Sequence, residues 1–328
     1  MRGPGARPPV AEPALGATAL HRRMTTLDRD HPVFILAMDH RDSLAKTTYG
    51  VDSGQPTDPA VIARISAGKQ LVYRGLLDAL SRGADRARAG VLVDERYGAE
   101  VARMVKDAGL QLAMPIEASG QDFFAFEYGD GTDGEWMRHV EEFDPDYVKV
   151  LVRDNPAFDE SDRAGQATRL AAVTTALHDA GRTFLLELLV PGTDDQEDSV
   201  DDYDRDLRPT LTVEVVGYLQ EHGVEPDVWK IEGLDRREDA ERIVAATRQG
   251  GRDSVQCIIL GRDAAQEDLD RWLSVAAPVD GFVGFAIGRS IWEEPLGHVV
   301  DGEMRSEDAE DVIAANYRHF EETYRDAC

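Results

Sequence analysis

Residues 146–152 (DYVKVLV), 183–190 (TFLLELLV) and 227–231 (DVWKI) are three short apolar runs, and each contains a lysine or a glutamate in its interior. Runs of four to eight apolar residues between polar segments are typical of strands buried on both faces of a parallel sheet. The charged residue inside each run must therefore be accommodated in the interior of the protein, where an isolated charge is costly.

Five further runs of the same kind lie along the chain. They are residues 33–38 (VFILAM), 90–93 (GVLV), 111–116 (QLAMPI), 255–260 (VQCIIL) and 281–287 (GFVGFAI). Amphipathic segments separate the runs, and their spacing predicts helices over 59–80, 99–108, 164–179, 209–222, 238–249, 267–276 and 306–324. Eight strands alternating with helices predict an α/β fold, a (β/α)8 or TIM barrel. A doubly wound open sheet is the alternative, although no G-x-G-x-x-G turn follows the first strand.

The chain of 328 residues is long enough for one large domain or two small ones. Because no linker interrupts the strand–helix alternation, we expect a single catalytic barrel over residues 31–328. Residues 1–30 are rich in Pro, Ala, Gly and Arg and lack periodicity, so we expect a disordered N-terminal arm there. The acidic stretch 194–206 predicts a solvated loop, with a lid over the site as the alternative.

The charge of the chain limits its partners. With 36 Lys+Arg against 63 Asp+Glu, the net charge is −27, which disfavours binding to nucleic acid and to anionic membrane surfaces. No apolar run approaches the roughly 18 residues of a membrane span. The two cysteines, Cys257 and Cys328, exclude a disulfide framework and predict a reducing, cytoplasmic location. An anionic substrate would need a local basic patch.

Lys149, Glu187 and Lys230 lie inside consecutive predicted strands. Since the helix layer around a barrel is apolar, these side chains are expected to point inward and to lie close together. Burial and mutual repulsion would lower the pKa of both lysines, and a neutral amine can form a Schiff base with a carbonyl group. Glu187 could then transfer protons. The alternative is a buried ion-pair network that only supports the barrel.

The carboxyl ends of the first, seventh and eighth strands also carry polar residues. Asp39, His40 and Arg41 follow the first strand and are candidates for orienting the substrate. Loops after strands seven and eight often bind phosphate in this fold. The candidates for phosphate binding are Arg262, Gly288, Arg289 and Ser290. A surface arginine that caps a loop is the alternative.

A metal site is not expected from the histidines, because no second histidine is spaced to join His40. A carboxylate-only Mg²⁺ site built from Asp94, Glu95 and Glu117 stays open. The residues thus leave three hypotheses: a Schiff-base lyase, a Mg²⁺-dependent isomerase, epimerase or aldolase, and a non-catalytic sugar-phosphate-binding protein. No serine-hydrolase motif is present.

Six segments together resemble a known group of enzymes. They are residues 34–44 (FILAMDHRDSL), 91–98 (VLVDERYG), 146–152 (DYVKVLV), 183–191 (TFLLELLVP), 227–234 (DVWKIEGL) and 281–295 (GFVGFAIGRSIWEEP). The order and spacing are similar to those of class I aldolases of the tagatose-1,6-bisphosphate aldolase type. The chain resembles still more the aldolase-like domain of myo-inositol catabolism, which occurs alone or fused to 5-dehydro-2-deoxygluconokinase. The resemblance covers about residues 31–325.

This resemblance implies a metal-independent aldol cleavage with no cofactor. It implies that Lys230 is the Schiff-base lysine, Glu187 the proton-transfer carboxylate and Lys149 the second active-site lysine. It also implies a substrate role for Asp39 and phosphate binding near Arg289. Lys149 stays the alternative Schiff-base residue, since other barrel lyases place the imine on strand four.

The sequence departs from the tagatose-bisphosphate pattern at three places. His40 stands where glutamine is usual, Asp42 where glycine is common, and Gly261-Arg262-Asp263 replaces a loop of small residues. These departures favour the inositol-pathway branch. The implied substrate there is 2-deoxy-5-keto-gluconate 6-phosphate, which gives dihydroxyacetone phosphate and malonate semialdehyde. Barrels of this type often associate, and Trp272, Trp292 and Tyr317 are candidates for a homo-oligomer interface, with packing inside the chain as the alternative.

Overall fold

A computed structural model describes residues 27–51, 56, 58–131 and 134–328. Eight parallel strands pair in sequence order, and β8 returns to β1 to close the barrel. The strands are β1 Val33–Met38, β2 Ala89–Val93, β3 Gln111–Pro115, β4 Tyr147–Arg153, β5 Thr183–Leu189, β6 Val228–Ile231, β7 Gln256–Leu260 and β8 Phe282–Ile287. Each lies within one residue of its predicted bounds. The predicted (β/α)8 barrel is confirmed, and the open sheet is excluded by the closed ring.

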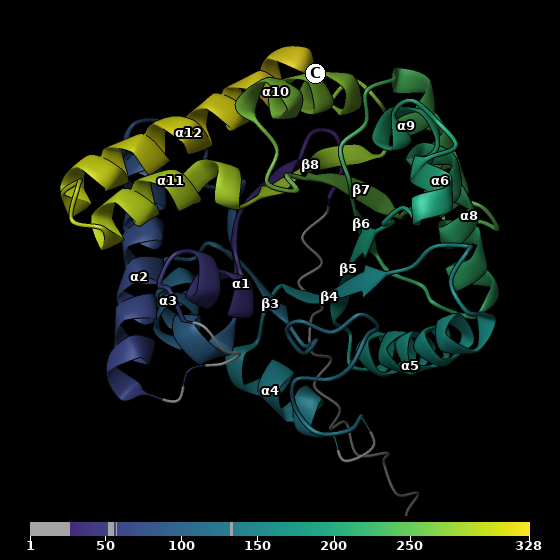
Figure 1. The fold of residues 1–328 in the computed structure, drawn as a ribbon, viewed down its shortest axis with the longest axis horizontal. Coiled ribbons are helices and arrows are strands. Elements are labelled where there is room, and N and C mark those ends of the chain that lie inside the picture. The colour runs from purple at the N-terminus through teal and green to yellow at the C-terminus, as the bar shows by residue number, and fades with distance from the viewer. Residues whose placement is uncertain (1–26, 52–55, 57, 132–133) are drawn as a thin grey trace, which may run out of the picture.

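The helices form an outer ring around the strands (Figure 1). They are α1 Asp42–Thr47, α2 Pro59–Ser81, α3 Glu95–Asp107, α4 Glu135–Phe143, α5 Glu160–Asp179, α6 Asp194–Glu197, α7 Tyr203–Asp206, α8 Arg208–Glu221, α9 Arg237–Thr247, α10 Gln266–Ala276, α11 Arg289–Val300 and α12 Ser306–Ala327. All seven predicted helices are present. The helices α1, α4 and α11 were not predicted from the sequence, and the acidic stretch 194–206 contains two short helices where only a loop was expected.

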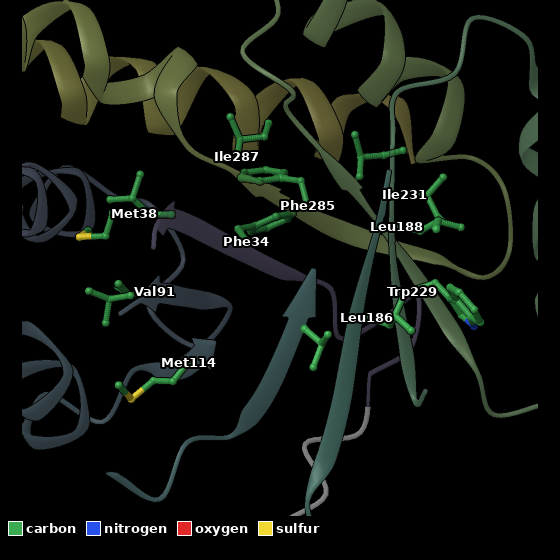
Figure 2. Packing of buried hydrophobic residues seen from close by; sticks show 14 of the residues in the cluster. Phe34, Met38, Val91, Met114, Leu186, Leu188, Trp229, Ile231, Phe285 and Ile287 are labelled. Carbon is green, nitrogen blue, oxygen red and sulfur yellow. The ribbon is translucent and has the colours of Figure 1, made fainter. Parts of the chain in front are cut away.

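The strand residues alternate between two apolar layers. Outward-facing side chains such as Leu186, Trp229 and Phe285 pack between the strands and the helices (Figure 2). A second cluster fills the inside of the barrel and contains Val33, Ile35, Ala37, Leu92, Ala113, Tyr147, Leu185, Val228, Ile258, Val283 and Ala286. Toward the carboxyl ends, the next inner position of four strands is polar instead. These residues are Asp39, Lys149, Glu187 and Lys230.

The aromatic residues proposed for an interface lie inside the chain. Tyr317 on α12 is fully buried and its hydroxyl donates to the Phe34 carbonyl at 2.8 Å. The Trp292 indole on α11 donates to the Ala37 carbonyl at 2.9 Å. Trp272 is 9% exposed and donates to Asp235. These side chains therefore pack helices onto the barrel, which is the alternative that the sequence left open, and the homo-oligomer stays a prediction.

The predicted N-terminal arm falls largely on residues 1–26, which lie outside the described residues. Of its last residues, Leu27 packs against the apolar cluster inside the barrel, and Asp28 pairs with His31 through a backbone bridge. Among the helices of the described ranges, none has the length and apolar character that a bilayer crossing needs.

Candidate active site

A cavity of about 340 Å³ opens at the carboxyl ends of the strands. The four predicted catalytic residues line it: Asp39, Lys149, Glu187 and Lys230. Of the predicted substrate- and phosphate-binding residues, His40, Arg41, Arg262, Gly288 and Arg289 also line it. Ser290 is not part of the lining, and its hydroxyl donates to the Ala264 carbonyl at 2.9 Å. Strands and loops far apart in the sequence thus converge on one chamber.

Lys149 is surrounded by three carboxylates. Its Nζ lies 2.8 Å from Asp39 Oδ2, 2.6 Å from Glu117 Oε1 and 2.9 Å from Glu187 Oε2. Burial works to lower the pKa of this ammonium group, but the three negative charges outweigh burial and hold the pKa well above its ordinary value. The expected lowering of the Lys149 pKa is therefore wrong, because the sequence did not reveal that three carboxylates surround this one lysine.

Lys230 has a single carboxylate partner in the described structure. Lys230 on β6 lies directly across from Glu187 on β5 in the strand register, and its Nζ is 2.7 Å from Glu187 Oε1. Glu187 therefore bridges the two lysines, with one oxygen on each. Burial works to raise the pKa of this carboxyl, but the two ammonium groups lower it overall. The short contact provides a direct route for a proton between Lys230 and Glu187.

The other two carboxylates around Lys149 differ in their proton affinity. Burial opposes ionisation of Asp39, but the Lys149 charge outweighs it and keeps the pKa far below the ordinary value. For Glu117, burial wins over the attraction of Lys149 and Arg41, so its pKa is raised. Glu117 was considered only as a magnesium ligand in the sequence analysis. The structure makes it a partner of Lys149 instead.

Lys69 on α2 holds the segment that follows β1 through hydrogen bonds to its backbone. This lysine is 1% exposed, and its Nζ donates to the Met38 carbonyl at 2.6 Å and to the His40 carbonyl at 3.0 Å. It also pairs with Asp94. Asp39 lies between the two anchored carbonyls, so Lys69 determines where the Asp39 carboxylate enters the cavity. No sequence feature had singled out Lys69.

His40 and Arg41 occupy different environments. The His40 ring packs edge-on against Trp292. Burial, aided by the nearby Arg289 and Lys69 charges, lowers the pKa of His40 to about 4 against the opposing effect of Asp39. His40 is therefore neutral at pH 7. Arg41 is buried and donates to the Glu117 carbonyl at 2.8 Å, and it pairs with Glu127 at 3.2 Å.

The predicted phosphate site lies where α11 begins. Gly288 precedes the first turn of α11, and a Cβ there would lie 2.5 Å from the Ala37 carbonyl oxygen, so only glycine fits. Helix N-termini attract anions through their free N–H groups. Arg289 at this terminus pairs with Asp263 at 3.0 Å. Arg262 pairs with Asp204 at 2.7 Å and with Glu232 at 3.1 Å.

These pairs change the expected electrostatics of the site. The lining contains six lysine or arginine and five aspartate or glutamate side chains. We expected a local basic patch at the site, because the chain has a net charge of −27. The positive charges of the lining are instead almost balanced by its carboxylates. A phosphate group at α11 would have to compete with Asp263 for Arg289, or be bound by the N–H groups of the helix.

The carboxylates of the magnesium alternative do not meet. Asp94 pairs with Lys69 and accepts from the Tyr97 N–H at the start of α3. Glu95 lies 2.8 Å from His139 Nδ1, outside the cavity lining, while Glu117 contacts Lys149. Within the described ranges, no group of three His, Cys, Asp or Glu side chains has an arrangement that could hold a metal ion.

The cavity lining also contains residues that were not predicted from the sequence. Arg153 is the last residue of β4 and lies two inner positions beyond Lys149. The two-residue period of a strand would have placed it on the same face. Asp263 has a positive φ of 57° and pairs with Arg289. Only the folded loop reveals that pair.

The fold and cavity define a (β/α)8 barrel with paired lysines and carboxylates at the carboxyl ends of its strands. The chain belongs to the family described as "Uncharacterized protein conserved in bacteria (DUF2090)", whose model matches residues 11–328. No curated protein matches the chain.

Several solved structures share the fold. One is Cgl0159 from Corynebacterium glutamicum, with 17% identity, a TM-score of 0.53, and coverage of 90% of this chain and 88% of that chain. Another is an archaeal fructose 1,6-bisphosphate aldolase, with 15% identity, a TM-score of 0.55, and coverage of 90% and 96%. A third is a fructose-bisphosphate aldolase from Slackia heliotrinireducens, with 13% identity, a TM-score of 0.50, and coverage of 87% and 86%. At these identities the likeness concerns the fold.

Proposed function

We propose that this protein is a class I aldolase, a carbon–carbon lyase that works through a Schiff base on Lys230. One observation carries the proposal: Lys230 lines the cavity with its Nζ 2.7 Å from Glu187, while Lys149 is enclosed by three carboxylates. A lysine can attack a carbonyl only as a free amine. Lys230 can become a free amine by transferring a proton to Glu187, its one carboxylate neighbour among the described residues. The three carboxylates around Lys149 instead stabilise its charged form.

The first step is imine formation. Glu187 accepts a proton from the Lys230 ammonium group, and the Nζ lone pair attacks the ketone carbon of the substrate. The carbinolamine then loses its hydroxyl group as water, for which Glu187 returns the proton. The product is a positively charged imine on Lys230. Lys149 keeps its charge throughout and donates hydrogen bonds to substrate oxygens, and Asp39 orients the substrate.

The second step breaks the carbon–carbon bond. A carboxylate, for which Glu187 is the nearest to Lys230, removes the proton from the hydroxyl group two carbons from the imine carbon. The bond electrons move into the imine and give an enamine, while the hydroxyl carbon leaves as an aldehyde. Protonation of the enamine carbon and hydrolysis of the imine then release the second product and restore Lys230.

The proposed substrate is a phosphorylated keto sugar or keto sugar acid. The α11 N-terminus with Gly288 and Arg289 supplies the phosphate site, and the departures at His40 and Arg262 favour 2-deoxy-5-keto-gluconate 6-phosphate. Cleavage of this compound gives dihydroxyacetone phosphate and malonate semialdehyde. Two of the proteins that share the fold are described as fructose-bisphosphate aldolases, which is consistent with a sugar-phosphate lyase.

The proposal includes the setting of the enzyme. It acts without a metal or other cofactor, in the cytoplasm, and as a possible homo-oligomer without nucleic-acid or membrane partners. Turnover that survives dialysis against a chelator supports the metal-independent mechanism. A loss of turnover that Mg²⁺ restores contradicts it and selects the magnesium alternative.

Borohydride trapping tests the Schiff base directly. The protein is incubated with 2-deoxy-5-keto-gluconate 6-phosphate, or with fructose 1,6-bisphosphate, and then reduced. We expect a stable adduct on Lys230, seen by mass spectrometry as a modified peptide that trypsin does not cleave after this residue. Lys230→Met removes the nucleophile, so kcat should fall about 10⁴-fold or more.

Two controls make the assignment specific. The exposed Lys46→Met variant should keep both the adduct and the activity. Lys149→Met should lower the activity but still be trapped on Lys230. An adduct on Lys149, or undiminished activity of Lys230→Met, would overturn the role of Lys230. The absence of any adduct despite turnover would overturn the class I mechanism.

A further inference from the structure

Four arginines line the cavity, and they differ in their partners. Arg41, Arg262 and Arg289 each pair with at least one carboxylate. Arg153 does not: among the described residues, no carboxylate oxygen lies within 4.0 Å of its guanidinium group, and its recorded side-chain hydrogen bond runs from Nη1 to the Gln121 carbonyl at 3.0 Å. In a chain with 63 acidic and 36 basic residues, an unpaired arginine in a cavity is unexpected.

The position of Arg153 is fixed by the fold. It ends β4, and the inner face of that strand carries Lys149, Leu151 and Arg153 in succession, all of them in the cavity lining. With a strand rise of about 3.3 Å per residue, the Arg153 backbone lies about 13 Å beyond Lys149 along the strand, on the side of the mouth. In a closed ring of eight strands, β4 lies opposite β8. Arg153 therefore lies across the mouth from the α11 N-terminus.

We propose that Arg153 binds an anionic group at the end of the substrate away from the α11 phosphate site. The substrate class is then a ketose with an oxyanion at both ends and its carbonyl group between them, at Lys230. The second oxyanion is a carboxylate or a second phosphate. This inference rests on the proposed function for the carbonyl chemistry, but the binding role of Arg153 can be tested apart from it.

The chemistry of the side chain supports this role. A guanidinium group has five N–H donors in a planar fork that matches the oxygens of carboxylates and phosphates. The Gln121 carbonyl uses one donor and holds the group in place at the β3–α4 loop. Ser119 and Gly120 of the same loop also line the cavity and can complete the subsite. An unpaired charge at this point favours ligands that carry a second negative group.

Binding of compounds without a carbonyl group tests the subsite independently of catalysis. The probes are glucitol 6-phosphate with one anionic end, 6-phosphogluconate with a carboxylate at the other end, and glucitol 1,6-bisphosphate with two phosphates. Their Kd values are measured by titration calorimetry for the wild type and for Arg153→Gln. We expect Arg153→Gln to weaken at least one of the two doubly anionic probes by about 10- to 100-fold and to leave glucitol 6-phosphate within about twofold.

Matched variants exclude indirect effects. Arg86→Gln removes the same charge from an exposed residue that precedes β2, at the other end of the barrel, and should change none of the three Kd values. Arg153→Lys keeps the charge but loses the fork, so it should restore part of the affinity. The probe that loses more affinity in Arg153→Gln identifies the second group as a carboxylate or a phosphate.

The outcomes separate this inference from the proposed function. Equal effects of Arg153→Gln on all three probes, or no effect on either doubly anionic probe, overturn the role of Arg153 even if borohydride traps Lys230. A selective loss for a doubly anionic probe supports it even if turnover leaves no borohydride adduct. In that second case the subsite stands and the class I mechanism fails.

Discussion

Lys149 and Lys230 are buried to a similar degree, at 2% and 4% exposure, yet their surroundings give them different chemistry. Lys149 contacts three carboxylates, so the negative groups around it outnumber its single positive charge. Lys230 shares Glu187 with Lys149 and has no other carboxylate within 4.0 Å among the described residues. The number of negative neighbours therefore favours Lys230 as the nucleophile and Lys149 as the permanent cation. This difference underlies the contrast between the two lysine variants proposed above.

His40 makes the stability of the protein depend on pH. Its pKa is lowered to about 4 in the fold, by burial first, whereas the unfolded chain has the ordinary value near 6.5. Between these values the unfolded state binds a proton that the native state does not, so the free energy of unfolding falls as the pH falls. The loss from this residue alone should reach about 2–3 kcal/mol at pH 4.

Urea unfolding of the wild type and of His40→Gln at several pH values between 7 and 4 isolates this contribution. Glu117, whose pKa burial raises, contributes with the opposite sign, and both proteins share this contribution. We expect the stability difference between the two proteins to shift in favour of His40→Gln as the pH decreases. A difference that is constant over this range would show that His40 does not titrate as stated.

At the level of elements, the contact between α2 and β1 sets the geometry of the site. Lys69 on α2 donates to the carbonyls of Met38 and His40, which lie on either side of Asp39. Its ion pair with Asp94 also ties β1 to the start of α3. A buried lysine on a helix face thus performs a positioning role for a catalytic candidate on a neighbouring strand.

Lys69→Met should therefore lower the free energy of unfolding by about 3–5 kcal/mol, because Asp94 is left as an uncompensated buried charge. Asp94→Asn in the Lys69→Met background should recover part of this loss, since the amide oxygen can still accept from the Tyr97 N–H without a charge. Denaturant unfolding of the two single variants and the double variant measures the coupling. Additive losses would contradict a direct pair.

The acidic stretch 194–206 contains two short helices, and one of them pairs with an arginine of the cavity lining. The sequence predicted a solvated loop, but Thr193 caps α6 and Asp202 caps α7. Asp204 on α7 then pairs with Arg208 and with Arg262 of the cavity lining. Part of the negative charge of this stretch is therefore used to neutralise an arginine at the site. The lid alternative stays a prediction.

At the level of the whole molecule, the net charge of −27 opposes compaction. Raising NaCl from about 20 to about 200 mM shortens the screening length to below about 10 Å, which weakens this long-range repulsion. The exposed ion pairs are weakened too, but each contributes only about 0–1 kcal/mol. We therefore expect the Tm to rise with NaCl.

Differential scanning calorimetry at constant pH measures this effect. Chloride is preferred to phosphate or sulfate, because those dianions are ligands of the proposed phosphate site at α11, and their binding there would itself raise the Tm. A parallel series with a neutral solute such as sucrose measures how much the Tm rises when the charge repulsion is not screened. A Tm that falls with NaCl would mean that the ion pairs outweigh the net repulsion.

The sequence by itself determined the barrel and the inward lysines. The eight apolar runs and the amphipathic segments between them are local patterns, set by the periods of strands and helices, so the strands could be placed within one residue. Asp39, Lys149, Glu187 and Lys230 could be identified for the same reason, because each is a charged residue in or just after an apolar run.

Beyond the cluster of Lys149, Glu187 and Lys230, only the tertiary structure decided which charges meet. The pairs Lys69–Asp94, Arg262–Asp204 and Arg289–Asp263 join residues from different strands, helices or loops. Trp292 and Tyr317 looked available for an interface, but the fold buries both. The partner of a side chain depends on three-dimensional distance and burial, which no local period encodes. For this reason the raised pKa of Lys149 and the unpaired Arg153 emerge only when the barrel closes.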